Sequence, residues 1–530
     1  MTVLERLHSA DRSVLAALCV GQVLELNDQA PATGTLIPLT LQDDEGRRIY
    51  ERSLRFVMLL ALRRLYPGQR VRIEYSAGHG VYVRLPGQPL ATDDLQRIEQ
   101  MMRELIRADL PFVKKTWRLE DAVSYFRRDG QTDKVELLQH RPFDYFNMYE
   151  CGGMWEYFYG AMVPSTGYVP VFALAPEGEG FVLMLPTAEA PDVPATYVHR
   201  PKHLQVFGQS ARWCEILGVL NASHVAELVE QRRMRAFIRV NEALHDKAIA
   251  AIAEKIVSAG QRVVLVAGPS SSGKTTFSGR LGVHLRVLGK QAVIISLDNY
   301  YRNRADLPLE EDGSVDLEAL HTIDVPLFRK QLGQLLAGEE VEIPKFDFIS
   351  SCREEKGIPM RFQNDTVMII EGIHGLNPAL CEGLPQEMIH RVFVSALTCI
   401  NLDDHNRIRT TDVRLLRRIV RDHQFRGTLP QETLSMWPSV RRGEEKWIFP
   451  FQEQADSMFN TALHYELPFL KHYASALLED IPTDSAVYHM ARRLCKTLHY
   501  FPETDPAIND EIPPLSLLRE FIGGCTIDKE

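Results

Sequence analysis

Residues 263–276, VVLVAGPSSSGKTT, decide the fold of the chain around them. The four apolar residues 263–266 are typical of a buried parallel strand. Residues 268–275 then fit the pattern G-x-x-x-x-G-K-[ST], and apolar residues recur beyond it at helical spacing, at Phe277, Leu281 and Leu285. The motif therefore stands between a strand and a helix. The alternative, a chance glycine- and serine-rich loop, is disfavoured because pattern and context agree.

The residue types of this loop suit the binding of nucleotide phosphates. Glycines let the backbone N–H groups turn inward around phosphate oxygens, and the start of the following helix adds partial positive charge. Lys274 reaches the β- and γ-phosphates, and the Thr275 hydroxyl ligates Mg²⁺. We therefore expect ATP and Mg²⁺ as cofactors, held by Gly268, Pro269, Ser270, Ser271, Ser272, Gly273, Lys274, Thr275 and Thr276.

The overall composition narrows the class of protein. At 530 residues the chain is long enough for about three or four domains. A net charge of -10 argues against a general nucleic-acid-binding surface but leaves room for a local basic face. The eight cysteines form no C-x-x-C pair, so neither a zinc site nor a disulfide framework is indicated. We expect a cytoplasmic protein, because there is no signal peptide and no apolar run approaching the ~20 residues of a membrane span.

Strand-like and helical stretches alternate after residue 262. We expect a helix over 275–289 and strands over 263–267, 292–296, 367–370 and 391–395. This alternation predicts an α/β fold with a parallel sheet and helices on both faces. Ligands of such sheets bind at the carboxyl ends of the strands.

Two acidic residues stand at these carboxyl ends. Asp298 follows the strand 292–296, where a carboxylate takes the proton of a substrate hydroxyl or holds Mg²⁺; the alternative is an Asp that caps the next turn. Glu371 ends the strand 367–370 at the Walker B position, which binds Mg²⁺ directly or through water. Its alternative is an exposed Glu at a strand end.

A cluster of arginines follows in residues 413–427, VRLLRRIVRDHQFRG. On a helix, the spacing i, i+3, i+4 and i+7 puts four cations on one face, at Arg414, Arg417, Arg418 and Arg421. Like charges at this spacing destabilise a helix by a few tenths of a kcal/mol per pair, which an anion such as ATP would offset. Arg426 lies in a glycine-flanked segment that could close as a lid. In the alternative, the face is solvated and paired with acids such as Asp412 and Asp422, and some of the four must serve that way.

These motifs together resemble the uridine kinase/phosphoribulokinase family of P-loop kinases. The resemblance covers about residues 260–480 and rests on GPSSSGKTT, SLDNYYR, IPKFDF with the following Arg353, IIEGIHGLN and RLLRRIVRDHQFRG. It implies phosphoryl transfer from ATP, with Asp298 as general base and with Lys274, Thr275 and Glu371 as the phosphate and Mg²⁺ site. It also implies that Arg418 and Arg421 act as catalytic phosphate arginines and that Arg426 is a lid arginine.

The same resemblance implies the acceptor site. Glu318, with Asp316 as the alternative, would grip ribose hydroxyls, and Tyr301 and Arg353 are expected beside it. Where uridine kinases read the base with a Tyr and a His, this chain has Phe346 and Ser351. Phe346 can stack on a base, but the two polar contacts are lost, which leaves the identity of the acceptor open. The nearby His321 and His374 are candidates to replace them, although a lone His is more often structural.

The first 190 residues resemble the front of threonyl-tRNA synthetases, through LLALRRLYPG, DLQRIEQMMRELI, KVELL and YFNMYECGG. This implies the end of a TGS module followed by the domain that edits mischarged tRNA. The editing site uses an H-x-x-x-H and a C-x-x-x-H pair, and these fall here on Arg52, Phe56, Cys151 and Trp155. We expect a domain that kept the fold and lost the editing chemistry, with Cys151 a packed thiol rather than a catalyst. It could still bind RNA or a small molecule.

The chain as a whole resembles bacterial fusion proteins described as uridine kinase-like or nucleoside kinases. We expect synthetase-like α+β domains before the kinase, with boundaries as follows: a β-rich module at 1–48, an editing-domain-like region at 49–190, a linker and helical connection at 191–245, the kinase at 246–485 and a helical extension at 486–530.

Some local structure is also expected. A helix is predicted over 50–66, and another after an N-cap at Thr92 or Asp93. Residues 186–205 look like a linker. In residues 437–452, cations alternate with Trp447 and Phe449, which fits a lid or substrate loop and equally a packed surface turn.

Three functions are carried forward. The leading hypothesis is ATP-dependent phosphoryl transfer to a hydroxyl of a nucleoside, uridine- or cytidine-like, or of a related small molecule. The second is an RNA-associated regulatory protein whose P-loop domain is an ATP switch, with RNA contacted by the N-terminal domain. The third is residual aminoacyl-ester hydrolysis at Cys151, which the missing histidines disfavour. No membrane partner is expected, and assembly into a homo-oligomer is left open.

Overall fold

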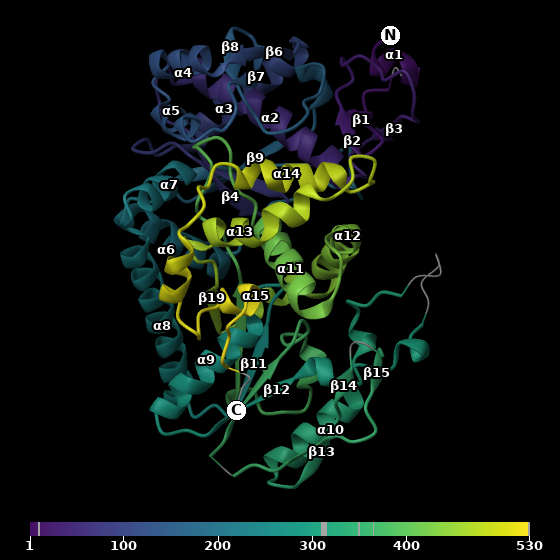
Figure 1. The fold of residues 1–530 in the computed structure, drawn as a ribbon, viewed down its shortest axis with the longest axis vertical. Coiled ribbons are helices and arrows are strands. Elements are labelled where there is room, and N and C mark those ends of the chain that lie inside the picture. The colour runs from purple at the N-terminus through teal and green to yellow at the C-terminus, as the bar shows by residue number, and fades with distance from the viewer. Residues whose placement is uncertain (9–10, 309–314, 348–349, 364, 528–530) are drawn as a thin grey trace.

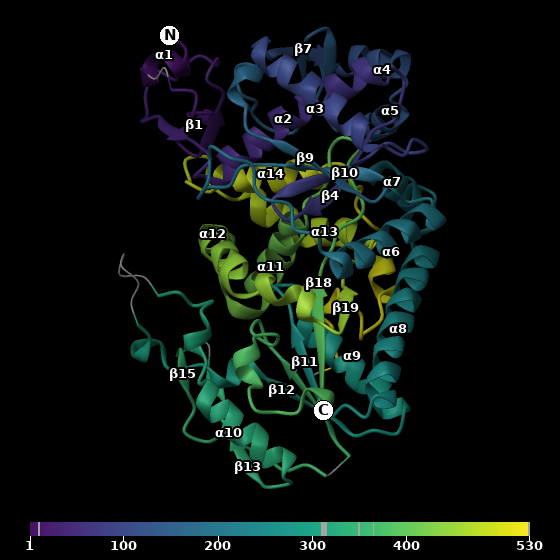
Figure 2. The ribbon, with the colours of Figure 1, turned by 180° about the vertical axis from the view of Figure 1, so that it is seen from behind.

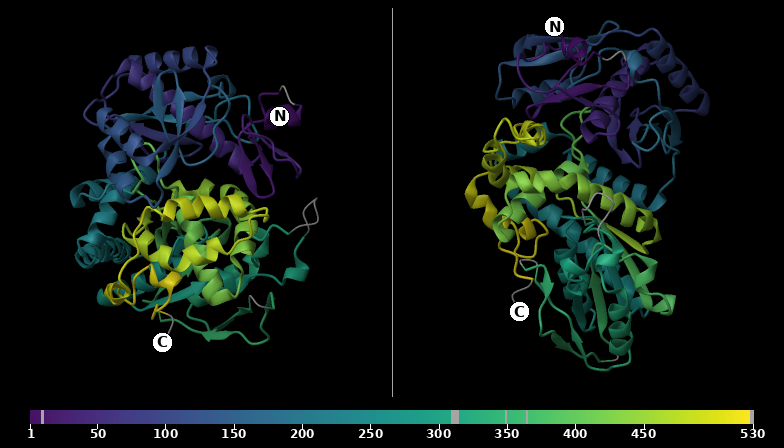
Figure 3. Two further views of the ribbon diagram at one scale, coloured as in Figure 1. Left: turned by 45° about the horizontal axis from the view of Figure 1, so that its top comes forward. Right: turned by 90° about the vertical axis from the view of Figure 1, so that its right-hand side faces the viewer.

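The computed structural model describes residues 1–8, 11–308, 315–347, 350–363 and 365–527. The N-terminal elements lie at one end of the long axis and a parallel sheet lies at the other (Figure 1). Helices α13 (Glu466–Glu479) and α14 (Tyr488–Leu498) lie between the two parts. Figures 2 and 3 show the same stacking from behind and from the side. Within the described residues, no helix combines the length and apolar character needed to cross a bilayer.

The sheet at the lower end has five parallel strands in the order β12-β17-β11-β18-β19. Their bounds are Val263–Ala267 (β11), Ala292–Ser296 (β12), Val367–Glu371 (β17), Ile389–Ser395 (β18) and Ser457–Asn460 (β19). The predicted α/β class is confirmed. The four predicted strands are present, and β19 is an edge strand that the sequence pattern did not reveal.

Alternate residues of β11 face opposite layers of helices, which is why this strand reads as a continuous apolar run. Val264 and Val266 pack with α8 (Met234–Ser258) and α9 (Lys274–Val287). Val263 and Leu265 pack with Phe328 of α10 (Val325–Leu336) on the other face. Each such fully buried side chain contributes about 1.5–3 kcal/mol. The parallel sheet is therefore covered on both faces, as predicted.

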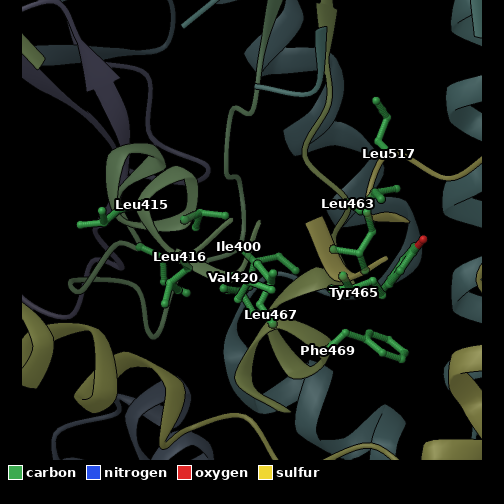
Figure 4. Close-up of a cluster of buried hydrophobic side chains, with 14 of the residues drawn as sticks. Ile400, Leu415, Leu416, Val420, Leu463, Tyr465, Leu467, Phe469 and Leu517 are labelled. Atoms are coloured by element: carbon green, nitrogen blue, oxygen red, sulfur yellow. The ribbon is translucent and has the colours of Figure 1, made fainter. Parts of the chain in front are cut away.

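A second layer of helices stands over the carboxyl ends of the strands. It contains α11 (Thr410–Arg426), α12 (Pro430–Trp447), α13 and α14. Figure 4 shows the core where α11 and α13 meet the C-terminal segment, at Leu415, Leu416, Val420, Leu463, Tyr465, Leu467, Phe469 and Leu517. Residues 437–452, for which a lid or substrate loop and a packed surface turn were both considered, are mostly helical: α12 runs through Pro438 to Trp447, and a 3-10 turn follows at Phe449–Gln454.

The N-terminal part is built around α2 (Asp44–Leu65), whose residues 49–62 are buried. It packs on an antiparallel sheet in the order β4-β5-β10-β9, with bounds Arg72–Ala77, Gly80–Arg84, Gly180–Met184 and Ala173–Glu177. Helix α3 (Thr92–Arg107) completes this core. The predicted N-cap at Thr92 or Asp93 is wrong: Ala91 is the N-cap, because the Asp94 carboxylate accepts its backbone N–H at 3.0 Å.

Smaller sheets flank this core. One has the order β2-β1-β3, with bounds Gln22–Leu24, Ala16–Cys19 and Ile37–Leu39, beside α1 (Val3–Leu7). The other has the order β6-β7-β8, with bounds Val113–Arg118, Tyr145–Cys151 and Met154–Glu156, beside α4 (Leu119–Arg128) and α5 (Thr132–Gln139). The segment predicted as a linker over 186–205 becomes helical at α6 (Pro201–Leu217), with Pro201 at the first position. Helix α7 (Ala222–Glu230) follows.

The two parts of the molecule are joined through residues 396–409, the connecting loop between β18 and α11. Its Asp403 is fully buried and accepts hydrogen bonds from Lys134 Nζ at 3.0 Å and from the Tyr157 hydroxyl. Lys134 is also fully buried and contacts Glu156 at 3.2 Å. Nearby, the Arg70 guanidinium pairs with Asp404 at 2.5 Å. We name the buried charges Lys134, Glu156 and Asp403 the ionic seam.

The start of α11 is fixed to the N-terminal part as well. Asp412 accepts hydrogen bonds from Arg48 of α2 at 3.1 and 3.3 Å. Arg409, the N-cap residue of α11, pairs with Glu51 of α2 at 2.5 Å. Helix α2 and the first turn of α11 are therefore held together by buried or half-buried ion pairs.

Candidate active site

The glycine-rich loop has a backbone that only glycine allows at two positions. A Cβ on Gly268 would lie 2.1 Å from the carbonyl oxygen of Val394 on β18, closer than any side chain tolerates. Gly273 caps α9 with φ of 85°, in the left-handed region. The first N–H groups of α9 are thereby turned toward the same side as the loop, as a phosphate site requires.

The polar groups of this loop suit phosphate oxygens. Among the described residues, the buried hydroxyls of Ser271 and Ser272 have no hydrogen-bond partner in the protein. Lys274 Nζ donates to the Pro269 carbonyl at 3.3 Å, and the Thr275 side chain is exposed. Buried hydroxyls without partners are costly, so an oxyanion ligand that accepts from them fits this loop.

The two strand-end carboxylates lie beside each other. Ser296 is paired in register with Glu371, and its hydroxyl donates to Glu371 Oε1 at 2.9 Å. The same hydroxyl oxygen accepts the backbone N–H of Asp298 at 3.3 Å. Burial raises the pKa of Asp298 and of Glu371 above the ordinary range, and the nearby Lys274 ammonium opposes the shift in both. The structure thus brings Asp298, Glu371 and Lys274 together at the carboxyl edge of the sheet.

Glu318 lies near Lys274 and Asp298, whereas Asp316 is bonded to other groups. Desolvation raises the pKa of Glu318 to about 7, the Glu444 carboxylate adds to the rise, and Arg418 and Lys274 oppose it. The Asp316 carboxylate instead accepts the Glu318 backbone N–H at 3.1 Å and the Trp447 indole N–H at 3.1 Å. Of the two acids considered for the acceptor site, Glu318 is therefore the one whose charge interacts with the P-loop lysine.

The arginines of α11 divide into two groups. Arg414 is buried, pairs with Glu444 and donates from Nε to the Ser270 carbonyl at 2.9 Å. Arg417 is buried and pairs with Glu466 at 2.6 Å. These two are the arginines of the cluster that pair with acids, as some of the four were expected to do, although their partners are Glu444 and Glu466 rather than Asp412 or Asp422. A buried cation requires a buried anion beside it. Arg414 and Arg417 support the P-loop by donating to its backbone carbonyls at Ser270 and Ser271.

Arg418, Arg421 and Arg426 lie beside the P-loop and Asp298. Arg418 Nη1 donates to the Ser270 hydroxyl at 2.9 Å. Arg421 and Arg426 lie close enough to Asp298 to oppose the rise of its pKa. Asp422 links the three, with contacts of 3.2, 2.7 and 3.7 Å. Arg426 is the last residue of α11, and the helix ends at Gly427 with φ of 64°.

The hairpin predicted to face the base is formed by β14 (Phe346–Asp347) and β15 (Cys352–Arg353). Residues 348–349 lie outside the described ranges. The Phe346 ring lies 5.6 Å from the Tyr301 ring. Arg353 donates to the carbonyls of Tyr300 and Tyr301 at 2.8 and 2.7 Å. Arg353 therefore fastens the hairpin to the segment that carries Tyr301. Short strands β13 (Val341–Ile343) and β16 (Ile358–Met360) form its base.

The two histidines considered as base contacts occupy different settings. His321 is exposed, whereas His374 is buried. Burial lowers the pKa of His374 to about 4, so it stays neutral at physiological pH. It lies against the backbone of residues 318–319, where it supports the segment that carries Glu318.

Two carboxylates that sequence reasoning missed also contact the P-loop. Glu444 of α12 accepts the Ser270 N–H at 3.0 Å. Glu520 of α15 (Arg519–Ile522) accepts the Thr276 hydroxyl at 2.7 Å and its N–H at 3.3 Å. No local motif marks either residue, since each is recognised only by its place in the folded chain.

At the four positions where the resemblance to the synthetases places the editing-site pairs, the side chains are packed against other parts of the protein. Arg52 is buried and donates to the Ala161 carbonyl, and the Phe56 ring packs 5.2 Å from that of Phe112. Burial raises the pKa of the Cys151 thiol to about 12, so it is a protonated, unreactive thiol. The Trp155 ring packs 4.7 Å from Trp117. Nowhere in the described ranges do three or more His, Cys, Asp or Glu side chains form a group able to hold a metal ion.

Comparison with known proteins matches both parts of the chain. Residues 263–466 match the phosphoribulokinase / uridine kinase family. Over 196 residues the chain is 30% identical to a uridine kinase of Deinococcus deserti. This alignment covers 37% of this chain and 84% of that protein. A Bacillus stearothermophilus structure described as a possible uridine kinase aligns with 40% of this chain and 98% of its own, at 19% identity and a TM-score of 0.27.

The N-terminal part matches threonine–tRNA ligases. The relative from Oleidesulfovibrio alaskensis is 33% identical over 165 residues, which is 31% of this chain. The chain spans 26% of the length of that ligase. Both resemblances predicted from the sequence, to uridine kinases and to the synthetases, are confirmed by these matches.

Proposed function

Because the chain belongs to the phosphoribulokinase / uridine kinase family, we propose that it transfers the γ-phosphoryl group of ATP to a hydroxyl of a nucleoside or related small molecule. The observation that carries this proposal is the meeting of Lys274, Asp298 and Glu371 at the carboxyl edge of the sheet. A P-loop lysine, a strand-end base and a strand-end metal ligand are the parts that phosphoryl transfer needs.

Asp298 accepts the proton of the acceptor hydroxyl. As the O–H proton moves to the carboxylate, the acceptor oxygen bonds to the γ-phosphorus, and the bond from that phosphorus to the β–γ bridging oxygen breaks to release ADP. The raised pKa of Asp298 suits a base of this kind, since proton transfer is most effective when the pKa lies nearer the working pH.

The cations stabilise the charge that moves during transfer. Lys274 faces the phosphates from the P-loop, and Arg418, Arg421 and Arg426 approach from α11. Such fixed positive groups act most strongly in a partly desolvated site. An Mg²⁺ ion held by the Thr275 hydroxyl and the Glu371 carboxylate would neutralise phosphate charge and orient the β- and γ-phosphates.

The acceptor site fits a molecule with vicinal hydroxyls and a flat ring. Glu318 accepts hydrogen bonds from hydroxyls, and the Phe346 ring offers a stacking surface beside Tyr301. Aromatic stacking holds a base without selecting it by hydrogen bonds, so several nucleosides are expected to bind. Uridine and cytidine are the first to test.

The proposal is tested by ADP release from the purified protein with ATP and Mg²⁺ against a panel of nucleosides. We expect strong stimulation by one or more nucleosides. If ATP binds and no nucleoside or related alcohol stimulates turnover, the proposal fails. The P-loop domain is then better explained as an ATP switch, and RNA binding by residues 1–190 becomes the next test.

The pKa of Glu318 predicts a pH dependence of acceptor binding. Below about pH 7 this carboxyl is protonated, and above it the ionised form accepts hydroxyl hydrogen bonds more strongly. We expect the acceptor KM to fall as the pH rises from 6 to 8. In Glu318→Gln, we expect KM to rise roughly 10- to 100-fold and to lose this pH dependence. Steady-state kinetics over this range measure both effects.

The matched control is Glu354→Gln, which neutralises an exposed carboxylate on the β14–β15 hairpin that pairs with Lys345. It should leave the KM profile unchanged. A Glu318→Gln variant whose KM keeps the wild-type pH profile would show that another group binds the acceptor.

A further inference from the structure

The Glu520 carboxylate lies where the P-loop binds anions. It accepts both the backbone N–H of Thr276, at 3.3 Å, and the Thr276 hydroxyl, at 2.7 Å. Thr276 is the third residue of α9 and follows the G-x-x-x-x-G-K-T motif directly. Its N–H is one of the groups at the helix start that have no acceptor within the helix and that turn toward phosphate in P-loops. A carboxylate from the C-terminal segment therefore holds a donor that the nucleotide would use.

Glu520 is placed there by a well-packed segment. Leu517, Leu518 and Phe521 are fully buried around it. Leu517 lies in the core shown in Figure 4, and a Cβ on Gly273 would lie 3.1 Å from its Cδ2 atom. The segment 515–527 therefore lies directly against the P-loop turn, beside α9 (Figure 1).

Further contacts fix this segment to the kinase core. The Phe521 ring lies 4.9 Å from the Arg417 guanidinium, which itself supports the P-loop. The Ser516 hydroxyl donates to Glu242 of α8 at 2.7 Å. The position of Glu520 is thus set by burial and hydrogen bonding on both sides of α15.

One N–H group cannot serve the Glu520 carboxylate and a phosphate oxygen at full strength, and two anions at this distance repel each other. We propose that Glu520 is an intramolecular competitor of the nucleotide phosphates, and that the C-terminal segment 515–527 closes the P-loop until ATP displaces this carboxylate. This inference rests on the proposed function, because it concerns the same nucleotide site. It makes the C-terminal extension a regulator of nucleotide affinity.

The competition has a thermodynamic signature that a structural role does not share. The Glu520 contact stabilises the nucleotide-free protein, since a negative charge at a helix N-terminus is favourable. The same contact opposes nucleotide binding. Removing the charge should therefore lower the Tm of the free protein and tighten nucleotide binding at once, whereas loss of a purely structural contact would weaken both.

The experiment compares the full chain with Glu520→Gln and with Glu511→Gln as the matched control. Glu511 lies in the same C-terminal region and pairs with the exposed side chains of Arg235 and Arg239 of α8. The Kd of ADP and of a non-hydrolysable ATP analogue is measured by calorimetry with Mg²⁺ at low and high salt, and the Tm of each free protein is recorded.

We expect Glu520→Gln to bind nucleotide about tenfold more tightly at low salt, with a smaller gain at high salt. Its Tm without nucleotide should fall, and Glu511→Gln should bind as the wild type does. If Glu520→Gln does not fold, Glu520→Asp is used, whose shorter side chain should also tighten binding.

Unchanged or weaker binding by the folded Glu520 variant, with a wild type that binds nucleotide, would overturn the inference and leave the proposed function intact. Tighter binding without phosphoryl transfer to any acceptor would support the inference and reject the proposed function. Failure of both proteins to bind any nucleotide would reject the two together.

Discussion

Replacing Asp298 with Asn should reduce kcat about 10²- to 10⁴-fold, the range that a general base contributes. The amide keeps the shape of the side chain and its place after Ser296, but it cannot accept the hydroxyl proton. Lys274 and the P-loop are unchanged, so the Kd of ATP should remain within a few-fold of the wild type. ADP release with a stimulating nucleoside measures kcat, and calorimetry measures ATP binding.

Asp306→Asn is the control for this substitution, because Asp306 is an exposed carboxylate eight residues further along that bonds to Asn303. Its kcat should match the wild type. An Asp298→Asn enzyme that retained most of its kcat would show that the proton goes to another group. Loss of ATP binding together with kcat would show instead that Asp298 acts through the nucleotide site.

The second large effect that we expect is a loss of stability when a charge of the ionic seam is removed. Removing the negative charge of Asp403 leaves the buried Lys134 ammonium with Glu156 as its remaining close carboxylate. Breaking a buried ion pair in this way costs about 3–5 kcal/mol. We expect Asp403→Asn to shift the urea midpoint for unfolding of the N-terminal part to markedly lower concentration, as followed by tryptophan fluorescence, to which Trp117 and Trp155 of this part contribute.

A double variant separates the loss of the pair from the loss of packing. Asp403→Leu combined with Lys134→Met removes both charges of this pair, while Glu156 keeps its contact with His405 at 2.6 Å. Apolar replacement of a buried pair is often neutral. The double variant should therefore unfold at higher urea than Asp403→Asn. A midpoint for Asp403→Asn equal to that of the wild type would mean that the seam contributes little to stability.

Part of the site follows from local sequence, and part depends on distant contacts. The P-loop and the strand-end acids Asp298 and Glu371 could be predicted, because a parallel sheet aligns the carboxyl ends of its strands. The roles of Arg414 and Arg417 could not, since they depend on Glu444 and Glu466, which are 30 and 49 residues away along the chain.

The same limit applies to the fold. The sequence pattern indicates a helix near residue 92, but its cap depends on whether the carboxylate of Asp94, the third residue of the helix, turns back to Ala91. Glu520 lies 244 residues from the Thr276 that it contacts, and nothing in its local sequence distinguishes it from other surface glutamates.

Helix α11 connects the N-terminal part of the molecule to the candidate active site. Its start is held to α2 through Asp412 and Arg409, while its C-terminal half carries Arg421 and Arg426, which lie near Asp298. Its seventeen residues form a helix about 25 Å long. A tilt of the helix by about 3° about its first turn would move its last turn by roughly 1 Å, which is enough to misplace a cation that acts on the phosphates. The alignment of the proposed phosphate arginines therefore depends on contacts with the synthetase-like domain, none of whose described residues is among those that we assign to the site.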